Sequence, residues 1–200
     1  MMTLYSDGIC PENHCVRLVL AEKDIHLECQ IINFQNQPED LPNLNPYNES
    51  LTFVDREVVL YEAQIIIEYL DERFPHPPLM PVDPVSRANN RLCRYRVQRD
   101  LYSHAQVLQR GSNKRKAATA RRKMRENLTS LAPIFAQTSY FMSDEYSLMD
   151  CYLGSLLWRL PIFSIELPRQ AKPVLSYADR LFNRDAFQTS LTKIEREMRA

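Results

Sequence analysis

The sequence predicts a chain of the α/β plus all-α class, with a small domain of sheet and helices followed by an all-helical domain. Strand-like and helix-like patterns alternate up to residue 74, whereas only helical periodicity follows residue 84. The stretch between them, FPHPPLMPVDP at 74–84, holds five of the thirteen prolines. Because proline fixes φ and lacks an amide donor, this stretch is predicted to be a stiff linker between domains 1–77 and 84–200.

Hydrophobic patterning along the first domain predicts its elements in order. Val16 and Leu20 recur at helical spacing, and Pro11 suits the first turn of that helix. The runs LTFV and EVVL flank the turn residues Asp55 and Arg56, as the strands of a hairpin would. The expected elements are strands at 2–6, 26–32, 51–54 and 57–60, helices at 12–23 and 62–74, and a short helix within 39–48. The side chains expected to face inward from the helix at 62–74 are Ile65, Ile66, Tyr69 and Leu70.

Helical periodicity and a capping signal divide the second domain. Ser147 followed by Asp150 predicts a capping box at the start of a helix over 147–160. Shorter helices are expected at 173–183 and 184–191. The apolar stripe of a helix at 84–109 consists of Ala88, Leu92, Tyr95 and Tyr102. The stripe of a helix at 113–136 consists of Ala117, Ala120, Met124, Leu128, Leu131 and Phe135.

Composition excludes several classes of protein. Lys plus Arg and Asp plus Glu both number 25, so bulk charge indicates neither a nucleic acid nor an acidic partner. Only three glycines are present, too few for a glycine-rich phosphate loop. No apolar run reaches the ~18 residues of a membrane span and no signal-peptide pattern appears, so a cytoplasmic protein is expected. The five scattered cysteines are expected to be thiols, and the four histidines have no metal-ligand spacing, so neither metal nor cofactor is expected.

The order of elements, the proline-rich linker and the S-x-x-D capping box resemble the glutathione-transferase fold, with a thioredoxin-like N-terminal domain and a helical C-terminal domain. Longer phrases resemble the stringent starvation protein A branch of that superfamily, and together they span nearly the whole chain. These phrases are VRLVLAEK, FVDREVVLYEAQIIIEYLDERFPHPPLMPVDPVSR, SLMDCYLGSLLWRLP and SLTKIEREMR. The resemblance implies a non-catalytic homodimer that binds bacterial RNA polymerase holoenzyme, core and sigma factor, and regulates transcription under starvation and stress.

The same resemblance implies a glutathione site that has lost two of its anchors. Leu51 stands before Thr52, where the family places a cis-proline, and a non-proline cis bond costs roughly 3–4 kcal/mol. The next helix opens with Glu62-Ala63 in place of a Glu/Gln-Ser pair. Losing a hydrogen bond to a charged group costs on the order of 1.5–3 kcal/mol, so glutathione binding is expected to be weak or absent.

Cys10 keeps an alternative open, namely a glutathione-dependent thiol transferase or reductase. Cys10-Pro11 at a helix start resembles the reactive position of glutaredoxins and thiol-using transferases, because a helix N-terminus stabilises a thiolate. Glu12 opposes that effect, and Cys15 lies too far along for a C-x-x-C pair. An ordinary thiol is the other interpretation of Cys10.

Two surface segments are candidates for partner binding. The first is FPHPPL, comprising Phe74, Pro75, His76, Pro77, Pro78 and Leu79, which the resemblance assigns to contact with RNA polymerase. Prolines reduce the entropy lost on docking, although a linker stiffened only to join two domains would look similar. The second is a basic helix face that could meet nucleic acid, although a solvated helix face is favoured. It consists of Lys114, Arg115, Arg121, Arg122 and Arg125.

Overall fold

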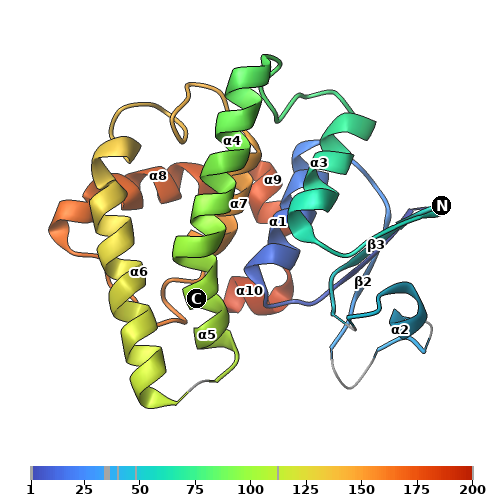
Figure 1. The fold of residues 1–200 in the computed structure, drawn as a ribbon, viewed down its shortest axis with the longest axis horizontal. Coiled ribbons are helices and arrows are strands. Elements are labelled where there is room, and N and C mark those ends of the chain that lie inside the picture. The colour runs from blue at the N-terminus through green and yellow to red at the C-terminus, as the bar shows by residue number, and fades with distance from the viewer. Residues whose placement is uncertain (1, 34–36, 40, 48, 112, 200) are drawn as a thin grey trace. The chain divides into compact units, whose positions relative to one another are not determined.

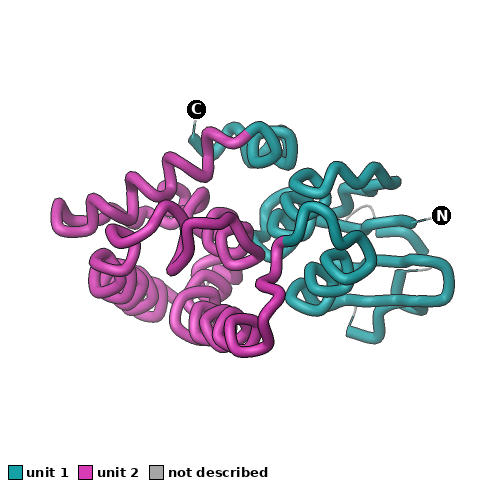
Figure 2. Tube along the Cα trace, turned by 90° about the horizontal axis from the view of Figure 1, so that it is seen from above, with its two compact units in different colours: residues 1–78, 185–200 teal, residues 79–184 magenta. Residues whose placement is uncertain are grey.

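The structure is a computed structural model that describes residues 2–33, 37–39, 41–47, 49–111 and 113–199. The chain forms two compact units, residues 1–78 with 185–200 and residues 79–184 (Figure 2). A four-stranded sheet lies in the first unit and the second is built from helices, as the predicted class requires. None of the helices formed by the described residues has the length and hydropathy of a membrane span.

The sheet of the first unit has the spatial order β2–β1–β3–β4. β1 (Met2–Ser6) pairs in parallel with β2 (Glu28–Ile31), and the intervening helix supplies the crossover that a parallel pair requires. β3 (Thr52–Asp55) pairs antiparallel with β1 and places Phe53 opposite Leu4. β4 (Val58–Leu60) completes the hairpin. All four predicted strands are therefore confirmed.

Three helices accompany this sheet: α1 (Pro11–Glu22), α2 (Leu41–Leu44) and α3 (Ala63–Arg73) (Figure 1). α1 packs against α3, whose buried side chains include Ile66, Ile67 and Leu70. The prediction that Ile65 faces inward is wrong, since that side chain is 56% exposed, and Tyr69 is only half-buried. Three consecutive isoleucines at this point fit two adjacent helix faces equally well, and contact with α1 selects the face that contains Ile67.

The end of the chain belongs to the first unit. α9 (Asp185–Ser190) packs on α1, and α10 (Lys193–Glu197) follows it. The guanidinium of Arg17 forms a buried ion pair of 2.6 Å with Glu195 Oε1. It also donates to the carbonyls of Ser190 and Asp7, at 3.3 and 2.7 Å. The expected helical domain at 84–200 therefore contributes its last segment to the first unit.

The second unit contains helices joined by connections of different lengths. α4 (Pro84–Val97) begins where the Asp83 carboxylate accepts the amides of Val85 and Ser86, at 3.0 and 2.9 Å. The single helix expected at 84–109 is interrupted by a π-helical turn, which the residue pattern did not indicate. The elements after α4 are η1 (Gln98–Tyr102), α5 (Ser103–Gln109), α6 (Lys114–Phe135), α7 (Leu148–Leu157), the 3₁₀ turn η2 (Arg169–Ala171) and α8 (Lys172–Phe182).

Asp150 fixes the start of α7, which is buried along its whole length. Its carboxylate accepts the amide of Ser147 at 2.8 Å, which confirms the predicted capping box. The amide of Phe141 and the hydroxyl of Tyr177 donate to the other carboxylate oxygen, at 2.9 and 2.7 Å. Burial raises the pKa of Asp150, while these hydrogen bonds oppose that shift. One side chain thus joins the cap of α7 to α8 and to the preceding loop.

The two predicted apolar stripes of the second unit differ in burial. Along α6, Ala120, Met124, Leu128 and Phe135 of the predicted stripe are buried, while Ala117 and Leu131 are half-buried. Along α4, Leu92 and Tyr95 are 52% and 56% exposed, and Ala88 is also exposed. Tyr102 alone of the first stripe is buried, stacked on Tyr152 with ring centroids 4.1 Å apart. α4 therefore presents an apolar face that the described residues leave uncovered.

Candidate functional site

In the loop before α1, backbone amides are hydrogen-bonded by the carboxylate of Asp7. Asp7 Oδ1 accepts the amides of Ile9 and Cys10 at 2.9 and 2.6 Å, and its Oδ2 accepts the hydroxyl of Ser50 at 3.0 Å. Amides near a helix start are the groups that would bind an anion or stabilise a thiolate. Asp7 already satisfies two of them, so they are not available to a ligand.

The Cys10 thiol, at the N-cap position of α1, is held in its protonated form. It donates a hydrogen bond to Glu12 Oε2 at 3.1 Å. Burial, and then the negative charges of Glu12 and Asp7, raise the pKa of Cys10 far above that of a free thiol. A reactive cysteine needs a positive environment that lowers the pKa, so this arrangement disfavours nucleophilic chemistry.

The turn into β3 is held by an asparagine that the sequence did not single out. The buried Asn45 amide donates to Thr52 Oγ1 at 3.1 Å and to the carbonyl of Glu49 at 3.2 Å. Leu51 is buried, and the one cis peptide bond of the described residues joins His76 to Pro77, so the bond entering Leu51 is trans. The Asn45 side chain therefore occupies two acceptors of this turn, the Glu49 carbonyl and the Thr52 hydroxyl.

α3 begins at Ala63, with Glu62 as its N-cap, and neither residue has a hydroxyl group. The Glu62 carboxylate caps the helix by accepting the amide of Gln64 at 3.4 Å, and Ala63 is buried. Burial raises the pKa of Glu62, and the nearby charges of Glu12 and Glu49 raise it further. Glutathione carries two carboxylates, so a cluster of carboxylates repels it. Within the described residues, no group of three or more His, Cys, Asp or Glu side chains is placed to hold a metal ion.

The proline-rich segment presents an exposed tip at the end of α3. Pro75, His76, Pro77 and Pro78 are all exposed. Phe74 is half-buried, and the guanidinium carbon of Arg73 lies 5.3 Å from the centre of its ring. Leu79 is only 4% exposed, and its carbonyl accepts the amide of Leu148 at 2.8 Å. Leu79 was expected to contact a partner, and its burial removes it from that surface.

A buried lysine holds this exposed tip in place. Lys23 lies directly after α1, and its ammonium donates to the carbonyls of Phe74 and Pro77, each at 2.7 Å. The same ammonium pairs with Asp71 Oδ1 of α3 at 2.7 Å, and the two side chains are 0% and 8% exposed. Two of these interactions hold carbonyls of the segment, and the third fixes the ammonium to α3. We call this arrangement the Lys23 clamp.

The predicted basic face of α6 does not act as one surface. The Arg121 guanidinium donates to the carbonyl of Phe163 at 2.7 Å and is half-buried. Arg122 pairs with Glu126 one turn later, at 3.0 Å. Lys114, Arg115 and Arg125 are exposed. The charge available to nucleic acid is therefore smaller than the residue run suggests.

Comparisons with known proteins agree with this architecture. The description "Glutathione S-transferase, N-terminal domain" matches residues 1–72, and "Glutathione S-transferase, C-terminal domain" matches residues 92–185. A glutathione S-transferase structure from Methylobacillus flagellatus with bound glutathione superposes with a TM-score of 0.84 at 20% identity, over 96% of this chain and 99% of that one. That likeness shows the fold, and confirms the predicted class.

Relatives found by sequence identify the family as well as the fold. A "Stringent starvation protein A homolog" of Coxiella burnetii is 43% identical over 100% of this chain and 95% of its own length. The homolog of Pasteurella multocida is 45% identical over 96% of this chain and 90% of its own length. This chain therefore belongs to the stringent starvation protein A family, which is built on the glutathione S-transferase fold.

Proposed function

We propose that this protein is a non-catalytic regulator that binds bacterial RNA polymerase holoenzyme through the exposed tip at Pro75–Pro78 and acts under starvation and stress. The polymerase assignment follows from the family resemblance of the phrase DERFPHPPLMPV. The observation that supports it in this chain is the Lys23 clamp, which orders an otherwise irregular segment. A segment ordered before docking loses little conformational entropy when it binds.

The side chains of the tip suit a protein partner. The rings of Pro75, Pro77 and Pro78 offer apolar area, and the imidazole of His76 combines an aromatic body with two polar nitrogens. Interfaces place such anchors at their centre, where they account for most of the binding energy. We therefore assign the principal contact to Pro75, His76 and Pro77, with a smaller contribution from Pro78 and the half-buried Phe74.

The alternative enzyme, a thiol transferase that uses Cys10, is disfavoured by four features of the first unit. Asp7 occupies the amides before α1, and Glu12 keeps the Cys10 thiol protonated. The turn at Leu51 is satisfied by Asn45, and Ala63 has no hydroxyl. Each feature removes an interaction that a glutathione enzyme would use.

We also propose a homodimer in which α4 contributes to the contact between subunits. Val85, Ala88, Leu92 and Tyr95 lie along one side of this helix and are exposed. Burying such a stripe against a second copy would remove apolar area from water.

The experiment that tests the proposed function is a binding assay with two arms. The purified protein is titrated into RNA polymerase holoenzyme and, separately, with reduced glutathione. Saturable binding to holoenzyme without measurable glutathione binding is the expected result. Tight glutathione binding without polymerase binding would reverse the assignment in favour of the enzyme.

A further inference from the structure

A groove between α5 and α6 of the second unit brings two lysines and a histidine together. We call it the basic groove and define it by His104 and Val107 of α5 and by Lys116, Ala120 and Lys123 of α6. Its cavity measures about 500 Å³, within the range of small-molecule pockets. Arg115, Asn113 and Thr119 complete its lining.

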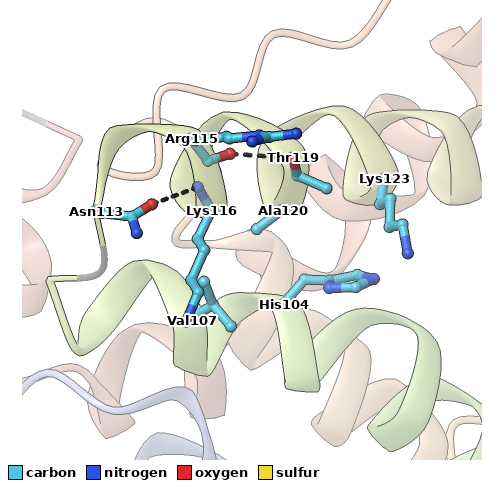
Figure 3. Close-up of a pocket in the computed structure, with 8 residues that line it drawn as sticks. All are labelled: His104, Val107, Asn113, Arg115, Lys116, Thr119, Ala120 and Lys123. Carbon is cyan, nitrogen blue, oxygen red and sulfur yellow. Dashed lines mark hydrogen bonds between the residues drawn. The ribbon is translucent and has the colours of Figure 1, made fainter.

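The arrangement of the two lysines sets the length of a ligand. Lys116, Ala120 and Lys123 share one face of α6, because they follow each other at spacings of four and three residues. Figure 3 shows the side chains of Lys116 and Lys123 reaching toward α5, one at each end of the groove. A rise of about 1.5 Å per residue places the two positions roughly 10 Å apart along the helix. Val107 and the buried Ala120 also line the groove and offer apolar surface.

Two other cations of α6 have partners, and Lys114 and Arg125 lie on the side of the helix away from the groove. Arg122 pairs with Glu126, and Arg121 donates to the carbonyl of Phe163. The Lys116 and Lys123 ammonium groups and the His104 ring form no hydrogen bond or ion pair with any residue that the structure describes. The Asn113 side chain, by contrast, is occupied in capping α6 through the amide of Lys116 at 2.9 Å.

We propose that the basic groove binds a small organic dianion, with one acidic group near Lys116, the other near Lys123 and His104, and an apolar middle over Val107 and Ala120. Carboxylate and phosphate-type groups share the chemistry that the lysines recognise. This site goes beyond the proposed function and does not depend on it, since it lies on elements distinct from the proline-rich tip. It would give the protein a way to respond to a metabolite.

His104 makes the proposed binding dependent on pH. Burial, and then the charge of Lys123 on α6, lower the pKa of His104, while Asp100 on η1 opposes the shift. The imidazole is therefore mostly neutral near neutral pH in the free protein. An anion beside it raises the pKa in the complex, so the proton-linked part of the affinity is fully present below the free-state pKa. That part is lost as pH rises through the higher pKa of the complex.

The test titrates the full chain with suberate and with hexamethylene bisphosphonate, whose acidic groups sit at the two ends of an apolar chain. Inorganic phosphate serves as a single-anion probe. Calorimetry gives the affinity, and the NMR signal of His104 locates the site. We expect a dissociation constant below about 1 mM for at least one of the two dianions, and binding of phosphate at least tenfold weaker. The dianion that binds more tightly then identifies the acidic group.

Two double variants distinguish binding in the basic groove from an effect of the protein's overall charge. The double change Lys116→Gln/Lys123→Gln should weaken dianion binding at least tenfold. The matched control Lys114→Gln/Arg125→Gln removes the same charge from the other side of α6 and should leave the affinity unchanged. His104→Gln should abolish the increase in affinity that the linkage predicts as the pH falls below neutral.

Three outcomes would overturn the proposal. The first is the absence of a His104 response to either dianion at millimolar concentration. The second is equal binding of inorganic phosphate, which would show that the apolar middle contributes nothing. The third is an equal loss of affinity in both double variants, which would mean that the lysines act only through overall charge.

Discussion

Replacing Lys23 with Met should destabilise the protein far more than removing an ordinary surface charge. The ammonium makes three contacts of 2.7 Å, to Asp71 Oδ1 and to the carbonyls of Phe74 and Pro77, with both charged side chains almost fully buried. Removing one partner of a buried pair costs about 3–5 kcal/mol, because the remaining charge loses its compensation. For a chain of this size each kcal/mol lowers the melting temperature by roughly 2–4 °C, so we expect a decrease of about 6–20 °C.

Urea unfolding of Lys23→Met, beside Lys114→Met on the exposed surface of α6, measures this effect. The control should lie within about 0.5 kcal/mol of the wild type. The double variant Lys23→Met/Asp71→Asn should recover part of the loss, because it removes both charges. A loss in Lys23→Met no larger than that of the control would refute the reasoning that the clamp is a buried, cooperative unit.

Three further predictions concern the other parts of the chain. Cys10 should react with iodoacetamide at pH 8 much more slowly than a free thiol, since its raised pKa keeps it protonated; a rate at or above that of a free thiol would contradict the site geometry. Glu195→Gln should destabilise the protein by about 1–3 kcal/mol, because the buried Arg17 loses its anionic partner, and equilibrium unfolding without a measurable loss would show that the pair contributes nothing. Leu92→Glu/Tyr95→Glu should give a monomer by sedimentation, while Leu175→Glu, on the exposed side of α8, should not; a dimer that survives the α4 change would place the interface elsewhere.

The order of strands and helices could be predicted because the signals that set it are local. Proline at 74–84, the spacing of Val16 and Leu20, and the capping box at Ser147 each act within a few residues. Leu51 and Ala63 could likewise be recognised as departures from the family motif at single positions.

The rest depends on contacts between residues that are far apart in the sequence. Lys23 and Asp71 form the clamp, and Arg17 and Glu195 anchor the chain end, although nothing in the local sequence marks either pair. Asp7 has no family signature, yet its carboxylate occupies the amides before Cys10. The basic groove was missed for a related reason, since Lys116 and Lys123 gain significance only through their position opposite His104.

The measurement that tests the central claim most directly is the affinity for RNA polymerase holoenzyme of the triple variant Pro75→Ala/His76→Ala/Pro77→Ala. The control Pro161→Ala/Ile162→Ala changes exposed apolar residues of the second unit. Both proteins should remain folded, because the Lys23 clamp uses only the carbonyl of residue 77 and not its side chain. We expect binding of the triple variant to fall at least tenfold, about 1.4 kcal/mol, with the control unchanged. Unchanged affinity in a folded triple variant would contradict the account and leave the proline-rich segment as a stiff connector.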